Sequence, residues 1–425
     1  MAIHWSVPNA MSNLRTASQL SHLEALASQA DDGVWQGQFR SLRLSSVFQP
    51  VVTLSTGRVV GHEGLVRLDY ADGRGATPFR FFSGGLDEAG LVELDTLCRL
   101  LHLRNFQGQA GTADGWLFLN VSPLVVASHR RHGEFLANIL EKSGFDPARV
   151  VVEIAESGVQ DGDTLADAVA HYRQIGCLVA IDDYGVGLSS LTRLWSLGVD
   201  IVKLDRELLL AALARHEERR LLPGLVEFLH DCGALVLMEG VETYEEAMLA
   251  LEVGCDLAQG FHFAFPAPVL RDRAQIIPID MPRAVSSTPV GAVPVSSWPD
   301  VWCLQLVAAA QRLAGGATLA DATAPMLDEI SLLRCYWLDV DGIQRSDSLL
   351  GARAGRPRFA MLLDQPGADA SGRGFFARAV ANPDSVQRSR AYLQRGFGVA
   401  CVTLAVTASL AGAPGVLCCD VAWRA

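Results

Sequence analysis

The sequence has few cysteines, and their spacing excludes two kinds of stabilising site. Nine cysteines occur among 425 residues, no two of them form a C-x-x-C pair, and Cys418 and Cys419 are adjacent. A disulfide framework needs an even set of paired cysteines, and structural zinc needs closely spaced thiols. We therefore expect reduced thiols in a cytoplasmic protein.

Excess positive charge and long apolar runs are also missing. The chain carries 35 Lys and Arg against 47 Asp and Glu, a formal net charge of -12. This charge argues against binding to long nucleic acid, although a small anionic ligand remains possible because one bound metal can reverse the local field. The first residues do not resemble a signal peptide, and no uncharged apolar stretch could span a bilayer. We expect no membrane span.

The chain divides into segments of different pattern. Residues 1–45 are weakly patterned and predict a helical leader, residues 46–275 a barrel domain, residues 276–297 a linker rich in Pro, Ser and Val, and residues 298–425 a smaller α+β domain. Within the second segment, short apolar strands alternate with amphipathic stretches. The predicted strands are 47–54, 59–68, 115–122, 149–156, 177–184, 199–205, 234–241 and 256–263. Eight strands with intervening helices predict a (β/α)8 TIM-like barrel, with a doubly wound sheet as the alternative.

Polar and charged side chains follow nearly every predicted strand. A single acid in such a place usually caps a helix or lies in a turn. In a parallel barrel, however, the carboxyl ends of all strands open on one face, where active sites form. We therefore expect these side chains to converge. They are Glu63, Asn120, Glu153, Glu156, Asp182, Asp183, Lys203, Asp205, Glu239, Glu242 and Gln259.

Several carboxylates in one place repel one another, so a cation should lie between them. The donors would be oxygens, without a His or Cys cluster, which favours Mg²⁺ or Mn²⁺ over Zn²⁺. Lys203 lies in the apolar run VDIVKLD and should point into the barrel mouth, toward the acids. Arg67, four residues after Glu63, could hold phosphate as a fork, although a lone arginine more often forms a surface salt bridge.

Ordered motifs between residues 45 and 268 resemble those of the EAL family of cyclic-di-GMP phosphodiesterases. They read EGLVR, FLNVSP, VEIAE, DDYGVG, VKLD, EGVET and QGFHFAFP. Gly64 stands where the family usually has Ala. In DDYGVG, Tyr184 replaces Phe and Val186 replaces Thr, so the hydroxyl is lost from a loop that couples the metal site to the dimer interface in the family.

The resemblance implies hydrolysis of cyclic-di-GMP to linear pGpG with two Mg²⁺ or Mn²⁺ ions per site. It implies that Glu239 is the general base, that Lys203 holds the attacking water, and that Glu156 braces the DDYGVG loop. Substrate would contact Gln49, Arg67, Asp205 and Gln259. The metal would be held by Glu63, Asn120, Glu153, Asp182, Asp183 and Glu242. A homodimer is also implied.

The last domain resembles small sensory domains of the PAS/Cache type, which often place aromatic and Arg residues around a ligand pocket. Arg373, Phe376, Arg378 and Tyr392 fall in the comparable stretch. This implies a small ligand or a dimer contact that regulates the barrel. The alternative is that Phe375 and Phe376 are core residues and the arginines are solvated.

Two other functions remain open from the sequence. The chain could bind cyclic-di-GMP as a receptor or scaffold with poor turnover, which the loss of the threonine hydroxyl at Val186 mildly favours. It could also be an unrelated metal-dependent barrel enzyme, such as a lyase of the enolase kind, although the ordered motifs argue against this.

Overall fold

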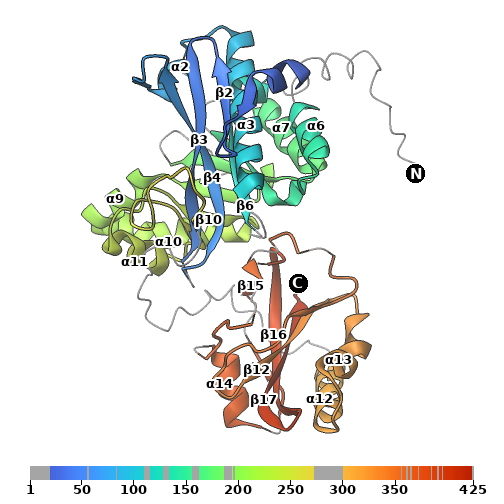
Figure 1. Ribbon diagram of the computed structural model, residues 1–425. Coiled ribbons are helices and arrows are strands. Elements are labelled where there is room, and N and C mark those ends of the chain that lie inside the picture. The colour runs from blue at the N-terminus through green and yellow to red at the C-terminus, as the bar shows by residue number, and fades with distance from the viewer. Residues whose placement is uncertain are drawn as a thin grey trace. The chain divides into compact units, whose positions relative to one another are not determined.

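Two compact units, residues 1–279 and 280–425, make up the chain in the computed structural model (Figure 1). The structure describes residues 20–271 and 300–423, apart from 55–56, 83, 110–114, 128–133, 156–161, 186–193, 195–196, 356, 360–361, 364–365, 372, 384, 390–391 and 395. Among the described helices, none has the length and apolarity needed to cross a membrane.

Eight strands close into a barrel in the first unit, as predicted. In order around the ring they are β3 (Leu42–Thr53), β11 (Leu257–Ala258), β10 (Leu235–Met238), β9 (Ile201–Leu204), β8 (Leu178–Tyr184), β7 (Val150–Ala155), β6 (Trp116–Val121) and β4 (Val59–Tyr70). Pairing of β3 with β4 closes the ring. The other seven barrel strands, β4, β6, β7, β8, β9, β10 and β11, run parallel to one another, so their carboxyl ends meet at one mouth.

One strand departs from a fully parallel barrel. β3 is antiparallel to both β4 and β11. The reason is local, because only residues 54–58 separate β3 from β4, and Thr53 and Arg58 are already hydrogen-bonded. A parallel pair would need a crossover of a dozen or more residues, whereas an antiparallel pair needs only a tight turn.

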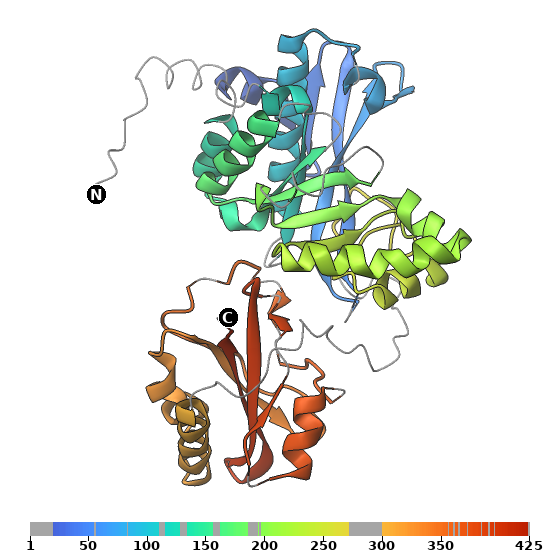
Figure 2. The ribbon, with the colours of Figure 1, turned by 180° about the vertical axis from the view of Figure 1, so that it is seen from behind.

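Helices surround the ring of strands (Figures 1 and 2). They include α3 (Glu88–Gln109), α6 (Glu134–Ser143), α7 (Gly162–Ile175), α9 (Arg206–Ala214), α10 (His216–Asp231) and α11 (Tyr244–Glu252), with short α2 (Pro78–Phe82) and α4 (Pro123–Ala127). Because the parallel strands are covered on both sides, their residues are buried almost without interruption, as in β9 and β10.

Residues 1–45 are not a helical leader throughout. Residues 20–25 are helical, but β1 (Ala27–Gln29) and β2 (Trp35–Phe39) follow and β3 begins at Leu42, so the boundary at residue 46 cuts a strand. β1, β2 and β5 (Gly75–Ala76) extend the sheet beyond the barrel. The cause is a hairpin that the sequence analysis missed: β2 turns into β3 through Arg40, whose φ is 54°.

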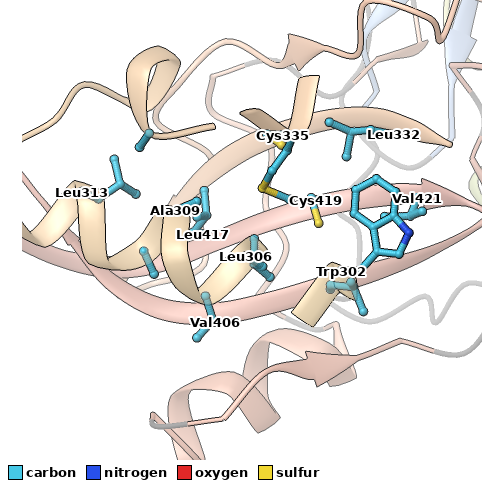
Figure 3. Packing of buried hydrophobic residues seen from close by; sticks show 14 of the residues in the cluster. Trp302, Leu306, Ala309, Leu313, Leu332, Cys335, Val406, Leu417, Cys419 and Val421 are labelled. Atoms are coloured by element: carbon cyan, nitrogen blue, oxygen red, sulfur yellow. The ribbon is translucent and has the colours of Figure 1, made fainter. Parts of the chain in front are cut away.

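The second unit is α+β, as predicted. Its antiparallel sheet has the order β13 (Leu349–Leu350), β12 (Leu332–Asp339), β17 (Ala413–Ala422), β16 (Val399–Leu410) and β14 (Gln387–Arg388), and β15 (Tyr392–Gln394) also pairs with β16. Helices α12 (Asp300–Ala314) and α13 (Leu319–Leu327) pack on one face, where Trp302, Leu306 and Cys419 are buried together (Figure 3). Its likeness to PAS or Cache domains stays a prediction.

The opposite face of this sheet is covered by α14 (Gly374–Ala381). Phe375 and Phe376 pack there against Tyr336 and Leu338 of β12. Both phenylalanines are thus core residues, which favours the structural alternative for them. Arg378 donates a hydrogen bond to the carbonyl of Arg388 at 2.6 Å.

Candidate active site

Lys203 lies at the centre of a group of carboxylates at the barrel mouth. Its Nζ is 2.6 Å from Glu153, 2.7 Å from Glu239 and 2.9 Å from Asp182, with Glu63 at 4.0 Å. The side chain of Lys203 is 1 % exposed and that of Glu153 is fully buried. The lysine therefore points inward, toward the acids, as the sequence predicted.

Strand register explains why residues far apart in the chain meet here. Asn120 pairs with Glu153 across β6 and β7, and Asp182 pairs with Ala155 across β7 and β8. Glu239 follows directly on β10, whose residue Leu237 pairs with Lys203. Parallel registry thus places each polar residue at the same end of its strand, which is the geometry of a barrel active site.

A chain of amides holds Glu63 from the other side of the mouth. Asn120 donates to one carboxylate oxygen of Glu63 at 2.6 Å, and Gln259 donates to the other at 2.8 Å. Gln259 also approaches the side-chain oxygen of Gln49 at 3.3 Å, and Gln49 donates to the carbonyl of Ala264 at 3.2 Å. Gln49 from the antiparallel β3 therefore joins the same site.

The four carboxylic acids around Lys203 carry more potential negative charge than its one ammonium group can neutralise. Burial lowers the pKa of Lys203, but Asp182, Glu153, Glu239 and Glu63 outweigh it and hold that pKa well above its usual range. Burial raises the pKa of Glu153 well above its ordinary value, and Glu63 adds to this despite the nearby Lys203. Burial likewise raises the pKa of Glu239 to about 8, although Lys203 opposes the shift. Such a site takes up protons or cations.

The donor set fits a divalent cation. Oxygens of Asp182, Asp183 and Glu239 lie within 4.8 Å of one another. Among the described residues, the second carboxylate oxygen of Glu153 is buried without a hydrogen-bond donor. Asp183 adopts a φ of 56°, a conformation that is costly for a residue other than glycine and often marks a functional site. Oxygen donors without Cys or His match Mg²⁺ or Mn²⁺ chemistry.

Three predicted residues lie apart from this cluster. Glu242 forms an ion pair with Arg206, and its side chain is 40 % exposed. Asp205 caps α9 by accepting a hydrogen bond from the backbone of Glu207 at 2.6 Å. Arg67 is exposed and its guanidinium donates to the carbonyl of Val66. Glu156 and Val186 lie outside the described residues.

Arg206 is a residue that sequence reasoning missed. It contacts Glu242 and also Glu246, the latter at 3.3 Å. Glu246 in turn forms a capping box with Thr243 at the start of α11. The available signal was weak: an Arg directly after VKLD, and a Glu three residues after a Thr, which is a helix-start pattern. Arg206 thus ties the loop after β10 to the start of α9.

Comparison with known proteins covers the barrel. Residues 33–266 match the family model described as "EAL domain". An uncharacterised protein of Azorhizobium caulinodans is 32 % identical over 239 residues, 54 % of this chain and 32 % of the relative. The cyclic di-GMP phosphodiesterase RocR of Pseudomonas aeruginosa is 29 % identical over 240 residues, 56 % of this chain and 59 % of RocR.

Among solved structures, the Bacillus subtilis YkuI protein, with an EAL domain and in complex with c-di-GMP and calcium, is 18 % identical with a TM-score of 0.49, covering 96 % of this chain and 99 % of YkuI. This chain spans less than two thirds of each of the two curated relatives named above. The family model nevertheless covers more than half of this chain, across every strand that carries the site. The chain therefore belongs to the EAL domain family.

Proposed function

We propose that this chain hydrolyses cyclic-di-GMP to linear pGpG with the help of divalent metal ions. The observation that carries the proposal is the group of four carboxylates around Lys203 at the barrel mouth. Support also comes from relatives named as cyclic di-GMP phosphodiesterases, RocR and, as a probable one, PdeB of Escherichia coli. An acidic site binds a phosphodiester only when cations offset its charge.

Different residues of the chain would bind the metal, accept the proton and hold the water. Glu63, Asn120, Glu153, Asp182 and Asp183 would hold Mg²⁺ or Mn²⁺, two ions per site. When bound, such ions stabilise charge at phosphorus and lower the pKa of water. With the cations bound nearby, Glu239 would be ionised and would accept the proton of the water that attacks phosphorus, and the bond from phosphorus to the leaving oxygen would break as the new bond forms. Lys203 would hold that water.

Substrate contacts would come from residues around this core. Gln49 and Gln259 are buried within the same hydrogen-bonded group as Glu63. Arg67 and Asp205 would contact substrate from outside the cluster, and Glu156 would brace the DDYGVG loop. Glu242 holds Arg206 in this structure, so we assign it to that ion pair and not to the metal.

Turnover with purified protein tests the proposal. The formation of pGpG is followed with Mg²⁺ or Mn²⁺, and again after chelation with EDTA. We expect turnover that EDTA abolishes and that falls by about 10² to 10⁴ in Glu239→Ala. Glu63→Ala should also lose activity. Glu217→Ala is the matched control, because Glu217 is exposed on α10. Turnover that survives Glu63→Ala and Glu239→Ala would reject the proposal.

A receptor role is the second candidate, and the absence of a threonine hydroxyl at Val186 favours it. The same assay separates the two functions, because a receptor binds cyclic-di-GMP without forming pGpG. We further propose that the chain forms a homodimer and that the second unit regulates turnover. The nine free thiols, most of them buried, are consistent with action in the cytoplasm, where thiols stay reduced.

A further inference from the structure

Helix α3 carries a buried ion pair that reaches the end of the strand holding Asn120. Arg99 Nη2 lies 2.5 Å from one carboxylate oxygen of Asp95, one helical turn earlier, and the two side chains are 3 % and 4 % exposed. The other carboxylate oxygen of Asp95 accepts a hydrogen bond from the backbone N–H of Ser122 at 2.8 Å. A charge-assisted hydrogen bond thus joins α3 to the chain directly after β6, at the barrel mouth.

Ser122 lies where β6 ends and α4 begins. It follows the last residue of β6 directly, and its carbonyl accepts a hydrogen bond from the backbone of Val126 in α4 at 3.0 Å. Its N–H lies between the strand and the helix, and Asp95 accepts it. Asn120 comes two residues earlier. The contact with Asp95 therefore fixes the backbone that carries the side-chain amide of Asn120.

The amide of Asn120 makes a contact at the mouth that depends on this placement. It donates to one carboxylate oxygen of Glu63 at 2.6 Å, and Gln259 donates to the other at 2.8 Å. Residues that orient metal ligands contribute to metal affinity although they do not touch the metal. Because Asn120 and Glu63 are both proposed metal ligands, the position of the end of β6 should affect metal affinity.

Stability alone does not account for the burial of Asp95 and Arg99. Replacing a buried ion pair by apolar residues of similar size is often neutral or stabilising. Within the described part of the chain, Nε of Arg99 is also buried without an acceptor, which adds to the cost of the pair. The pair does supply an oriented, charged oxygen beside β6, and a charged oxygen is a stronger acceptor than a neutral one.

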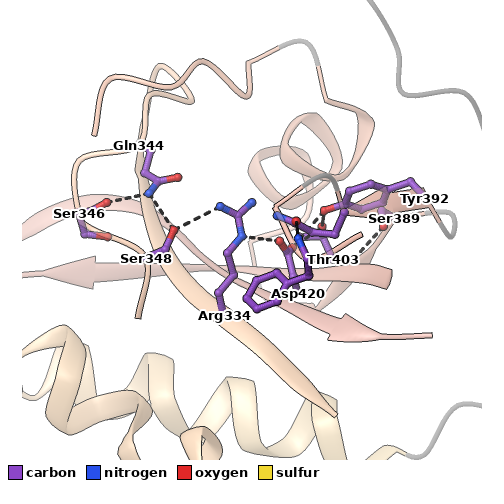
Figure 4. Close-up of polar contacts among 10 residues, drawn as sticks. Arg334, Gln344, Ser346, Ser348, Ser389, Tyr392, Thr403 and Asp420 are labelled. Atoms are coloured by element: carbon purple, nitrogen blue, oxygen red, sulfur yellow. Dashed lines mark hydrogen bonds and ion pairs between the residues drawn. The ribbon is translucent and has the colours of Figure 1, made fainter. Parts of the chain in front are cut away.

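A buried pair in the second unit provides a contrast (Figure 4). Arg334 and Asp420 lie 2.6 Å apart, and their side chains are 2 % and 0 % exposed. The other carboxylate oxygen of Asp420 accepts hydrogen bonds from the hydroxyls of Tyr392, at 3.2 Å, and Thr403, at 2.8 Å. These partners are side chains of strands in one sheet, so that pair joins strands to one another. Asp95 instead holds a backbone group next to a proposed metal ligand.

We propose that Asp95 is a positioning residue for the metal site. It acts through the backbone of Ser122, which sets where the side chain of Asn120 lies, and Asn120 in turn orients Glu63. The guanidinium of Arg99 holds the carboxylate of Asp95 in place. This inference rests on the proposed function, because it takes Asn120 and Glu63 as ligands of Mg²⁺ or Mn²⁺.

Two double variants separate the acceptor from the charge. Both carry Arg99→Met, and they differ only at position 95. Asp95→Asn keeps an oxygen that can accept the N–H of Ser122, whereas Asp95→Leu has a similar shape and no acceptor. Calorimetric titration of each full chain with Mn²⁺ measures metal affinity. We expect the variant with Asn to bind Mn²⁺ as the wild type does, and the variant with Leu to bind it about tenfold or more weakly. Equal affinity in the two variants would overturn the proposal.

Asn105→Leu controls for a general loss of stability. Asn105 is also buried on α3, and its side-chain oxygen accepts the backbone N–H of Trp35 at 2.7 Å. Trp35 belongs to β2, which lies outside the barrel ring. Asn105→Leu should therefore lower the urea midpoint and leave Mn²⁺ affinity unchanged. A matching loss of Mn²⁺ affinity in Asn105→Leu would reduce the role of Asp95 to stability.

Hydrogen exchange at the amide of Ser122 tests the contact itself. Exchange should be faster in the variant with Leu at position 95 than in the variant with Asn, because the amide has lost its acceptor. If the variant with Leu fails to fold, Asp95→Ala with Arg99→Met also lacks the acceptor and replaces it. Wild type that binds Mn²⁺ but forms no pGpG would reject the phosphodiesterase activity alone. Wild type that binds no Mn²⁺ would reject both proposals.

Discussion

Gly64 lies directly against the ring of His102. A Cβ atom at position 64 would meet His102 Cγ at 2.8 Å and His102 Cβ at 2.9 Å. His102 cannot easily move away, because it is buried and its Nδ1 is 2.8 Å from the hydroxyl of Ser46. Gly64 stands where the resembling motif usually has Ala. Glycine at position 64, in place of the usual Ala, therefore leaves room for the ring of His102 on α3.

Gly64→Ala should destabilise this protein, although Ala is common at the corresponding motif position. Inserting a methyl group into a packed interior forces its neighbours to shift and costs about 1–3 kcal/mol. Urea denaturation of the purified variant measures the change. A variant as stable as the wild type would contradict the contact.

A double-mutant cycle isolates the contact between these residues. His102→Ala removes the ring that the new methyl group would meet. We expect the Gly64→Ala/His102→Ala variant to be more stable than the sum of the two single effects predicts, by about 0.5 kcal/mol or more. Strict additivity would place the cause of the Gly64→Ala effect elsewhere.

Lys203→Met should strongly destabilise the metal-free protein. Lys203 lies within 3 Å of three carboxylates, and the pair with Glu153 is fully buried. Removing one partner of a buried ion pair costs about 3–5 kcal/mol because the other charge is left uncompensated. Mn²⁺ should restore part of the loss, since a cation can replace the ammonium. Lys142→Met is the control, because Lys142 is half-exposed and its ion pair with Glu24, at 3.8 Å, lies at the surface.

Two buried histidines should lower stability as the solution is acidified below pH 6.5, and the buried Glu239, whose pKa is raised, should act in the opposite direction. Burial lowers the pKa of His102 to about 3 and the pKa of His62 to about 4, from an ordinary 6.5. Below pH 6.5 the unfolded chain binds protons that the folded chain does not, so each histidine removes up to about 1.4 kcal/mol per pH unit. The loss continues until the pH reaches the folded pKa of each group.

His102→Gln should remove the contribution of one proton from the dependence of unfolding free energy on pH. Urea denaturation between pH 7 and pH 5 measures the slope. His216→Gln serves as the control, because His216 is exposed at the start of α10. An equal slope in His102→Gln and wild type would show that the interior histidine does not govern acid sensitivity.

Glu242→Ala should impair turnover far less than Glu239→Ala. Glu242 is held by Arg206 outside the carboxylate cluster, whereas Glu239 contacts Lys203. We expect Glu242→Ala to keep turnover within about tenfold of wild type, against a loss of about 10² to 10⁴ for Glu239→Ala. Arg206→Ala should resemble Glu242→Ala. Equal losses for Glu239→Ala and Glu242→Ala would return Glu242 to the metal site.

Much of the site could be predicted because strand periodicity and parallel pairing decide it. Once residues such as Asn120 and Glu153 are assigned to the ends of parallel strands, barrel geometry brings them together. The ion pair of Glu242 with Arg206 could not be predicted this way. It joins the first residue of α9 to the loop after β10, 36 positions further along the chain, and no local sequence pattern predicts which nearby carboxylate an arginine pairs with.

The first strands were missed for a different reason. The segments at 27–29 and 35–39 are too short for periodicity to separate them from a loop. Their strand character depends on pairing, of β1 with β2 and of β2 with β3, and Trp35 is fixed by Asn105 of α3, 70 residues away. The antiparallel direction of β3 was available from the sequence, since its turn into β4 is too short for a crossover.

The reversed strand β3 also constrains how the chain can fold. Two residue pairs join β3 to β11 in the ring, Leu257 with Thr53 and Ala258 with Val52. These partners are about 200 positions apart, so the loop-closure entropy must be overcome by the packing of all intervening strands and helices. During synthesis the ring cannot close until residue 258 has left the ribosome, so Gln259, directly after β11, is the last residue of the site to reach the mouth.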